Sequence, residues 1–404
     1  MLTACSAGAR RPGPDAFVIA PGTDPATRDA DIAFFEKRLT EDPASAADRA
    51  RLGGLYLARS RGNGAFADAE RAESLAMQSL ATREAHNGGT WALLASARLS
   101  GHDFTGALDA ARRYLASDPE SPQARAMLGE VLLETGGYDE ARPLFDSLEA
   151  HTRQPTIAAR LARWYEITGR LSHAQAVARY AAKVARLDGG LSREQVAWFQ
   201  MRVGDLALKR GAFAEADAAY AFGLRIAPDD HRLLAAQARL AAARRDWRTV
   251  IDRGERAVAL QLDPATLGLL ADAWRALGDT SQAESYARAM TVSALSQPGA
   301  IHRAWGLYLL DHGGPVADVL ARVRDEQRSR RDVYGYDLLA WALHASGDDR
   351  AAWRAAQRAI ALGTEDAPLL AHAAVIARAV GADAEADRLE ARAREVNPSW
   401  TRGR

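Results

Sequence analysis

MLGEVLLETGGYDEARPLF (residues 127–145) predicts two short helices joined by a turn at Gly136. Gly129 and Ala141 are small, so the two helices are able to approach closely, while Leu128 and Phe145 fill the space beside them. A single hairpin of this size has no partner for its apolar face. The stretch therefore predicts an array of stacked hairpins.

Glycines mark the period of this array. Most steps between them are 33 to 35 residues; one step is longer by about eight, and one is a double step in which Arg245 replaces the middle glycine. The recurring glycines are Gly136, Gly169, Gly211, Gly278, Gly313, Gly347 and Gly381. A fixed period of this length indicates a solenoid of identical units.

The residues around the glycines resemble the tetratricopeptide repeat, a helix–turn–helix unit of 34 residues. VGDLALKRGAFAEADAAYAFGLRIAP (residues 203–228) carries the pattern in full, and 127–145 carries most of it. The positions matched are Leu128, Gly129, Leu132, Ala141 and Phe145 in one unit and Val203, Gly204, Ala216, Tyr220 and Pro228 in the other. The resemblance implies an all-α fold, a right-handed superhelix whose first helices line a concave groove.

About ten units fill residues 46–399. We expect a lipid-signal remnant and flexible tether over 1–30, one solenoid over 31–399 and a disordered tail over 400–404, because Pro and Gly are frequent before residue 30. Two units are long by roughly eight residues, and in the first we expect the extra length in the turn at RSRGNGAF (59–66). This division leaves no room for a separate catalytic domain.

Composition excludes several classes of protein. Lys+Arg and Asp+Glu are 52 each, and this zero net charge argues against a nucleic-acid binder. A single cysteine excludes internal disulfides and cysteine zinc sites. No stretch approaches the roughly 20 apolar residues of a membrane-spanning helix.

The chain carries none of the common catalytic signatures: no phosphate loop, dinucleotide fingerprint, His-Glu-x-x-His pair or nucleophile elbow. We expect no enzyme activity, no cofactor and no metal. His302 and His312 are about 15 Å apart along one helix, so they do not share an ion, and they and His344 are interpreted as solvated or hydrogen-bonded. Trp305 is expected in the core, while Trp341 falls at a position that faces the groove.

The groove positions implied by the resemblance carry charges of both signs, with aromatic residues toward the C-terminal half. They are Glu130, Glu134, Arg163, Glu166, Trp198, Asp205, Arg239, Asp272, Arg275, Arg303, Tyr334, Asp337, Trp341 and His344. Such a groove suits a peptide or helix with alternating charges and an aromatic or aliphatic anchor. Solvated side chains without a binding role are the alternative interpretation.

Leu-Thr-Ala-Cys at residues 2–5 resembles the cleavage site of a bacterial lipoprotein signal. Cys5 is the only cysteine and precedes the tether, so we expect it to carry a lipid, with a basic start and an apolar stretch encoded upstream of Met1. The first hypothesis is a non-enzymatic scaffold of the bacterial envelope, anchored in the periplasm or at the outer membrane, that binds a protein or peptide in its groove. The alternative is a cytoplasmic peptide sensor or adaptor of the same fold in which Cys5 is incidental.

Overall fold

The structure is a computed structural model that describes residues 24–188, 190–296 and 302–399. This part of the chain contains α-helices, one short 3-10 helix and no β-strand. The first helices are α1 (Pro25–Glu41), α2 (Ala46–Asn63), α3 (Phe66–Thr82), α4 (Gly88–Ser100), α5 (Phe104–Ser117), α6 (Pro122–Thr135), α7 (Tyr138–Leu148), η1 (Glu149–His151), α8 (Pro155–Ile167), α9 (Leu171–Ala185), α10 (Arg193–Lys209) and α11 (Phe213–Ile226). The others are α12 (His231–Ala243), α13 (Trp247–Leu260), α14 (Pro264–Ala276), α15 (Thr280–Ser296), α16 (Arg303–Asp311), α17 (Val316–Glu326), α18 (Val333–Ala345), α19 (Asp349–Ile360), α20 (Ala367–Ala379) and α21 (Asp383–Val396).

Residues 127–145, at the turn between α6 and α7, fold as their sequence predicts. Ser121 caps α6 by accepting a hydrogen bond from the Ala124 amide at 3.3 Å, and Gly136 ends the helix with φ of +82°. Phe145 on α7 is fully buried, and a Cβ on Gly129 would lie 2.9 Å from its ring. The absence of a side chain at Gly129 therefore sets the close approach of α6 and α7.

From α2 to α21 the helices form hairpins in which even-numbered helices lie inside and odd-numbered helices lie outside. Successive inner helices contact one another, with α8 and α10 joined by the Glu166–Arg202 ion pair, and each outer helix before α21 packs against its own inner partner and the next hairpin. We call the even-numbered set the inner helices. The structure thus confirms an all-α solenoid.

Two local expectations differ from the structure. α1 begins at Pro25 and packs against α2, within the segment expected as tether, because Asp24 caps it and Pro25 suits its first turn. The extra residues of the first unit lengthen α2 to Asn63, where Gly64 with φ of +68° ends the helix, so only Gly64 and Ala65 form the turn.

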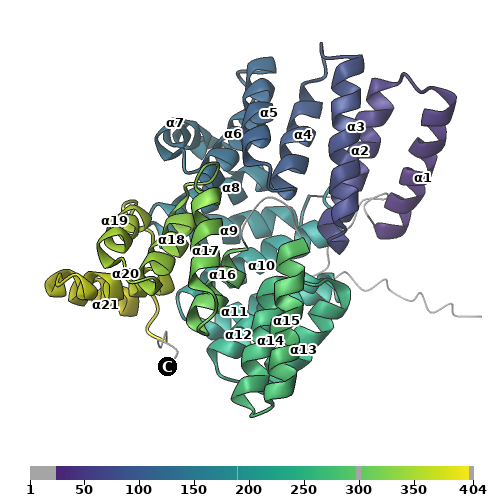
Figure 1. Ribbon diagram of the computed structural model, residues 1–404. Coiled ribbons are helices and arrows are strands. Elements are labelled where there is room, and N and C mark those ends of the chain that lie inside the picture. Colours follow the sequence, from purple (N-terminus) through teal and green to yellow (C-terminus); the bar gives the residue numbers. More distant parts are fainter. Residues whose placement is uncertain (1–23, 189, 297–301, 400–404) are drawn as a thin grey trace, which may run out of the picture.

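The superhelix contacts itself after five hairpins, so the later hairpins stack against the earlier ones (Figure 1). Each hairpin turn of the first five meets the loop that follows the hairpin five places later. The meeting pairs are Gly64 with Gln261, His102 with His302, Gly136 with Arg331, Gly169 with Gly363, and Gly211 with Asn397. We call this contact line the seam.

Hydrogen bonds along the seam join residues far apart in sequence. The Arg331 amide donates to the Thr135 carbonyl at 3.2 Å. Thr364 Oγ1 donates to the Ile167 carbonyl at 2.6 Å, across 197 residues. The Val333 amide donates to the Tyr138 hydroxyl at 2.9 Å, across 195 residues. These contacts close an array that would otherwise be held together by nearest neighbours alone.

The turn glycines of the last four hairpins face open space. A Cβ built on Gly278, Gly313, Gly347 or Gly381 has no neighbour within 4 Å. The superhelix therefore has one paired row of turns and one open row.

Candidate functional site

All fourteen predicted groove residues lie on inner helices. Glu130 and Glu134 are on α6, Arg163 and Glu166 on α8, Trp198 and Asp205 on α10, Arg239 on α12, Asp272 and Arg275 on α14, Arg303 on α16, and Tyr334, Asp337, Trp341 and His344 on α18. The structure divides them into a central ion network, an aromatic cluster and one residue beside a small recess.

Glu166 is the centre of the ion network, and only 3% of its side chain is exposed. Its Oε2 lies 2.8 Å from Arg202 and 3.0 Å from Arg163, and its Oε1 lies 2.7 Å from Lys209 Nζ. Burying an unpaired carboxylate costs several kcal/mol, so these three cations are what make the position tolerable.

Lys209 extends the network across the seam. Its Nζ, at the end of α10, lies 2.9 Å from Asp366 Oδ2 and donates a hydrogen bond to the Tyr334 hydroxyl at 2.9 Å. Asp366 also caps α20 by accepting from the Leu369 amide at 3.2 Å. The lysine thus joins α10 of the earlier hairpins to α18 and α20 of the later ones.

Tyr334 is surrounded by three cations from three other inner helices. Arg163 Cζ lies 5.4 Å, Lys209 Nζ 5.5 Å and Arg303 Cζ 5.1 Å from the centre of its ring. These distances are within the range of cation–π attraction. The ring therefore fills the centre of the superhelix where α8, α10, α16 and α18 converge.

Burial opposes every charge in the network, and the ion pairs outweigh it. Burial alone would raise the pKa of Glu166, but Lys209, Arg163 and Arg202 hold that pKa well below its usual value. Burial alone would lower the pKa of Lys209, but Asp366 and Glu166 hold it well above its usual value. The network is therefore ionised at neutral pH.

The remaining predicted charges of the centre are also paired. Asp205 accepts from the Tyr220 hydroxyl at 2.9 Å and contacts Arg239 at 3.2 Å. Asp337 contacts Arg303 and His372, and although its burial raises the pKa, these partners hold the pKa at about 2. Glu130 contacts Arg160 at 2.7 Å, and Glu134 contacts Arg330 at 3.4 Å across the seam. Most of the predicted groove is thus occupied by the chain's own ion pairs.

The aromatic cluster lies on later inner helices and takes no part in the seam. The Tyr308 and His312 rings are stacked with centroids 4.1 Å apart, and Trp341 is stacked on His372 at 4.3 Å and lies 5.3 Å from His344. We call these five residues the aromatic ribbon. All five are only partly covered, so their rings form a surface on α16, α18 and α20.

Acidic and basic side chains hold the ribbon in place. Trp341 Nε1 donates to Asp311 at 2.9 Å, and Arg275 donates to the Tyr308 hydroxyl at 3.0 Å. His312 Nε2 lies 3.0 Å from Asp272, and this contact raises the pKa of His312 against the effect of burial. The predicted residues Asp272 and Arg275 therefore position the rings from α14.

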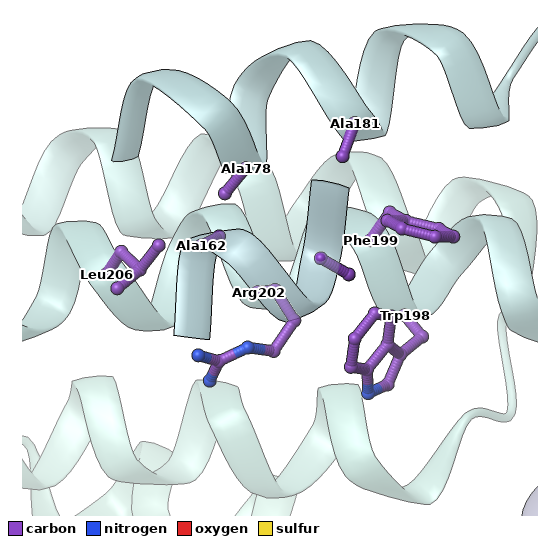
Figure 2. Close-up of a pocket in the computed structure, with 8 residues that line it drawn as sticks. Ala162, Ala178, Ala181, Trp198, Phe199, Arg202 and Leu206 are labelled. Carbon is purple, nitrogen blue, oxygen red and sulfur yellow. The ribbon is translucent and has the colours of Figure 1, made fainter. Parts of the chain in front are cut away.

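Trp198 lies at the edge of a small recess between α8, α9 and α10 (Figure 2). Four alanines, Phe199, Arg202 and Leu206 form the rest of its lining. The recess is open to solvent, and its volume of about 250 Å³ is below the range of typical ligand pockets.

Several residues of these clusters have no counterpart in the sequence analysis. Arg202, Lys209 and Asp366 complete the ion network, while Tyr308 and His372 complete the ribbon. The rarity of lysine could have marked Lys209 as a candidate, because it is one of only three lysines in a chain rich in arginine. Trp305 is 5% exposed, which confirms the expected core position.

Neither a metal site nor a membrane span is found in the described residues. No group of three or more His, Cys, Asp or Glu side chains among them is arranged to hold a metal ion. Of the helices the structure describes, none is both long enough and apolar enough to cross a membrane. Cys5 lies outside the described residues.

Comparison with known protein families finds a match, which covers part of the hairpin array. Residues 93–155, from α4 to the start of α8, match the family model of the tetratricopeptide repeat. This stretch is tetratricopeptide-like. No curated protein matches the chain. Together with the hairpin array, the match confirms the predicted tetratricopeptide-type solenoid.

Several solved structures also resemble the chain at low identity. One is a tetratricopeptide repeat protein from Parabacteroides merdae, 16% identical, covering 62% of this chain and 93% of that chain with a TM-score of 0.45. Another is TTC0263 from Thermus thermophilus, 20% identical, covering 49% and 98% with a TM-score of 0.40. The human IFIT1 dimer with PPP-AAAA is 14% identical, covering 90% and 94% with a TM-score of 0.49.

Proposed function

We propose that this chain is a non-enzymatic protein-interaction scaffold that binds a segment of a partner protein along the aromatic ribbon. The observation that supports this proposal is the set of partly exposed stacked rings on consecutive inner helices. Trp and Tyr dominate binding energy at protein interfaces, because they bury much area at little cost in side-chain entropy. The central ion network is less suited to this role, since its charges already satisfy one another.

The partner segment fits best if it presents an aromatic or aliphatic anchor. Trp341 and Tyr308 offer apolar ring surface, while Asp272, Asp311 and Arg275 around them offer polar contacts of both signs. A residue that stacks on Trp341 would extend the existing Trp341–His372 stack.

Removing Trp341 is expected to weaken partner binding by about 30-fold or more, the loss that defines an interface hot spot. Partners are recovered from the native cell by cross-linked affinity capture with the full chain, and their affinities are then measured with the wild type and Trp341→Ala. Trp353→Ala is the matched control, because Trp353 is a partly buried tryptophan on the outer helix α19. Equal affinity of all three forms for every recovered partner would show that the ribbon is not the binding surface.

The proposal places the scaffold in the bacterial envelope through a lipid at Cys5, with a cytoplasmic adaptor as the alternative. The support is the Leu-Thr-Ala-Cys sequence and its position before the helices. In the native cell, metabolic labelling with a palmitate analogue is expected to mark the wild type and to leave Cys5→Ser unmarked. Absence of label from the wild type, together with a cytoplasmic fraction, favours the alternative.

A further inference from the structure

Exposed apolar side chains gather at one end of the α13–α15 pair. Of nine large apolar side chains that are exposed in the described residues, four lie here, with Leu260 at 49%, Leu262 at 60%, Val292 at 70% and Leu295 at 47%. We call these four residues the outer apolar patch. Gatherings of this kind on a soluble surface mark a site that something covers.

The patch is one surface. Ser293 Oγ on α15 donates to the Leu262 carbonyl at 2.9 Å, so the loop after α13 lies directly against the end of α15. Val292 and Leu295 are three residues apart on that helix, which places them on neighbouring positions of one face.

The start of α1 lies beside the patch. Arg28 Nη1 is 3.5 Å from the position of a Cβ on Gly62, at the end of α2. Two residues later, a Cβ on Gly64 would overlap the side chain of Gln261. Gln261 stands between Leu260 and Leu262, so the chain enters α1 next to the patch.

The chain just before α1 carries an apolar run. Residues 16–20 are Ala-Phe-Val-Ile-Ala, between Pro14-Asp15 and Pro21-Gly22. Four to eight residues separate this run from Asp24, the cap of α1, and span roughly 13–28 Å when extended. That span suffices to reach from α1 across the last turn of α2 to Leu262.

We propose that residues 16–20 bind the outer apolar patch, with Phe17, Val18 and Ile19 against Leu262, Val292 and Leu295. The occupant is this segment because it is apolar, is attached beside the patch and is long enough to reach it. Attachment gives the segment a high effective concentration at the patch, which a separate molecule lacks. The contact fixes how the N-terminal segment leaves the scaffold and is independent of the aromatic ribbon and of a lipid at Cys5.

Disulfide trapping in the full chain tests the contact. Cys5→Ser removes the only cysteine, and Ala20→Cys with Ser296→Cys then places one thiol at the end of the apolar run and one beside the patch, leaving Phe17, Val18, Ile19 and the patch residues intact. Under dilute oxidising conditions, we expect the intramolecular disulfide to form at least about 10-fold faster than in the control Ala20→Cys with Ser281→Cys. Ser281 is also exposed and lies at the other end of α15, about 22 Å away along the helix.

A second variant separates specific docking from chance encounter. Val292→Asp in the trapping background is expected to reduce the rate about fivefold or more, whereas Leu277→Asp, an exposed apolar residue just before α15, leaves it unchanged. Equal rates for the two cysteine pairs overturn the proposal. So does a disulfide that forms only between molecules, which identifies a second copy as the occupant.

Discussion

Replacing Glu166 with alanine is expected to lower the free energy of unfolding by about 3 kcal/mol, the lower end of the range for breaking a buried ion pair. The substitution leaves Arg163, Arg202 and Lys209 without the carboxylate that they share. Because Lys209 also holds Asp366 across the seam, part of the loss is expected as weaker contact between the earlier and later hairpins. Urea titration of the two proteins measures the difference.

Glu140→Ala is the matched control. Glu140 contacts Arg112 at 2.9 Å, but 48% of its side chain is exposed, so its loss is expected to cost less than about 1 kcal/mol. A cost for Glu166→Ala no larger than that for Glu140→Ala would contradict the role assigned to the network.

The contribution of Glu166 has a defined pH dependence. Its pKa is lowered in the folded chain, so the stabilisation is present above the unfolded value of about 4.5 and is lost as the pH falls toward the folded value. The difference between wild type and Glu166→Ala is therefore expected to shrink below about pH 4.5.

Gly136→Ala is expected to destabilise the chain by about 2–5 kcal/mol, whereas Gly347→Ala costs about 1–2 kcal/mol. The two glycines end equivalent inner helices with φ of +82° and +86°, so the backbone strain of an alanine is the same. They differ in what the new Cβ meets. At Gly136 it would lie 2.3 Å from the Arg331 carbonyl oxygen, and at Gly347 it meets nothing within 4 Å.

Urea titration gives the two free energies, and hydrogen exchange locates the damage. The Arg331 amide, which donates to the Thr135 carbonyl, is expected to exchange faster in Gly136→Ala and to be unchanged in Gly347→Ala. Equal destabilisation by both substitutions would show that the seam adds nothing to stability.

The fold was predictable because its signals are local. Gly129 and Gly204 are required by close contacts within one hairpin and the turn glycines by their own positive φ, so each unit carries its own pattern. The placement of the groove residues on inner helices follows from the same pattern.

The pairing of those residues was not predictable from spacing. Lys209 meets Asp366 only because the superhelix returns to itself after five hairpins, and that pitch depends on small angles summed over many helix contacts.

The seam also determines the order in which contacts form while the chain is being translated. Its hydrogen bonds join residues 194 to 197 positions apart, so each early hairpin emerges long before the loop that will cover it. At 5–20 residues per second, that interval is roughly 10–40 s. Throughout this period the nascent first half holds Glu166 with its arginines and Lys209 but without Asp366 or Tyr334. The Glu166–Lys209–Asp366 network is therefore complete only after residue 366 has been translated.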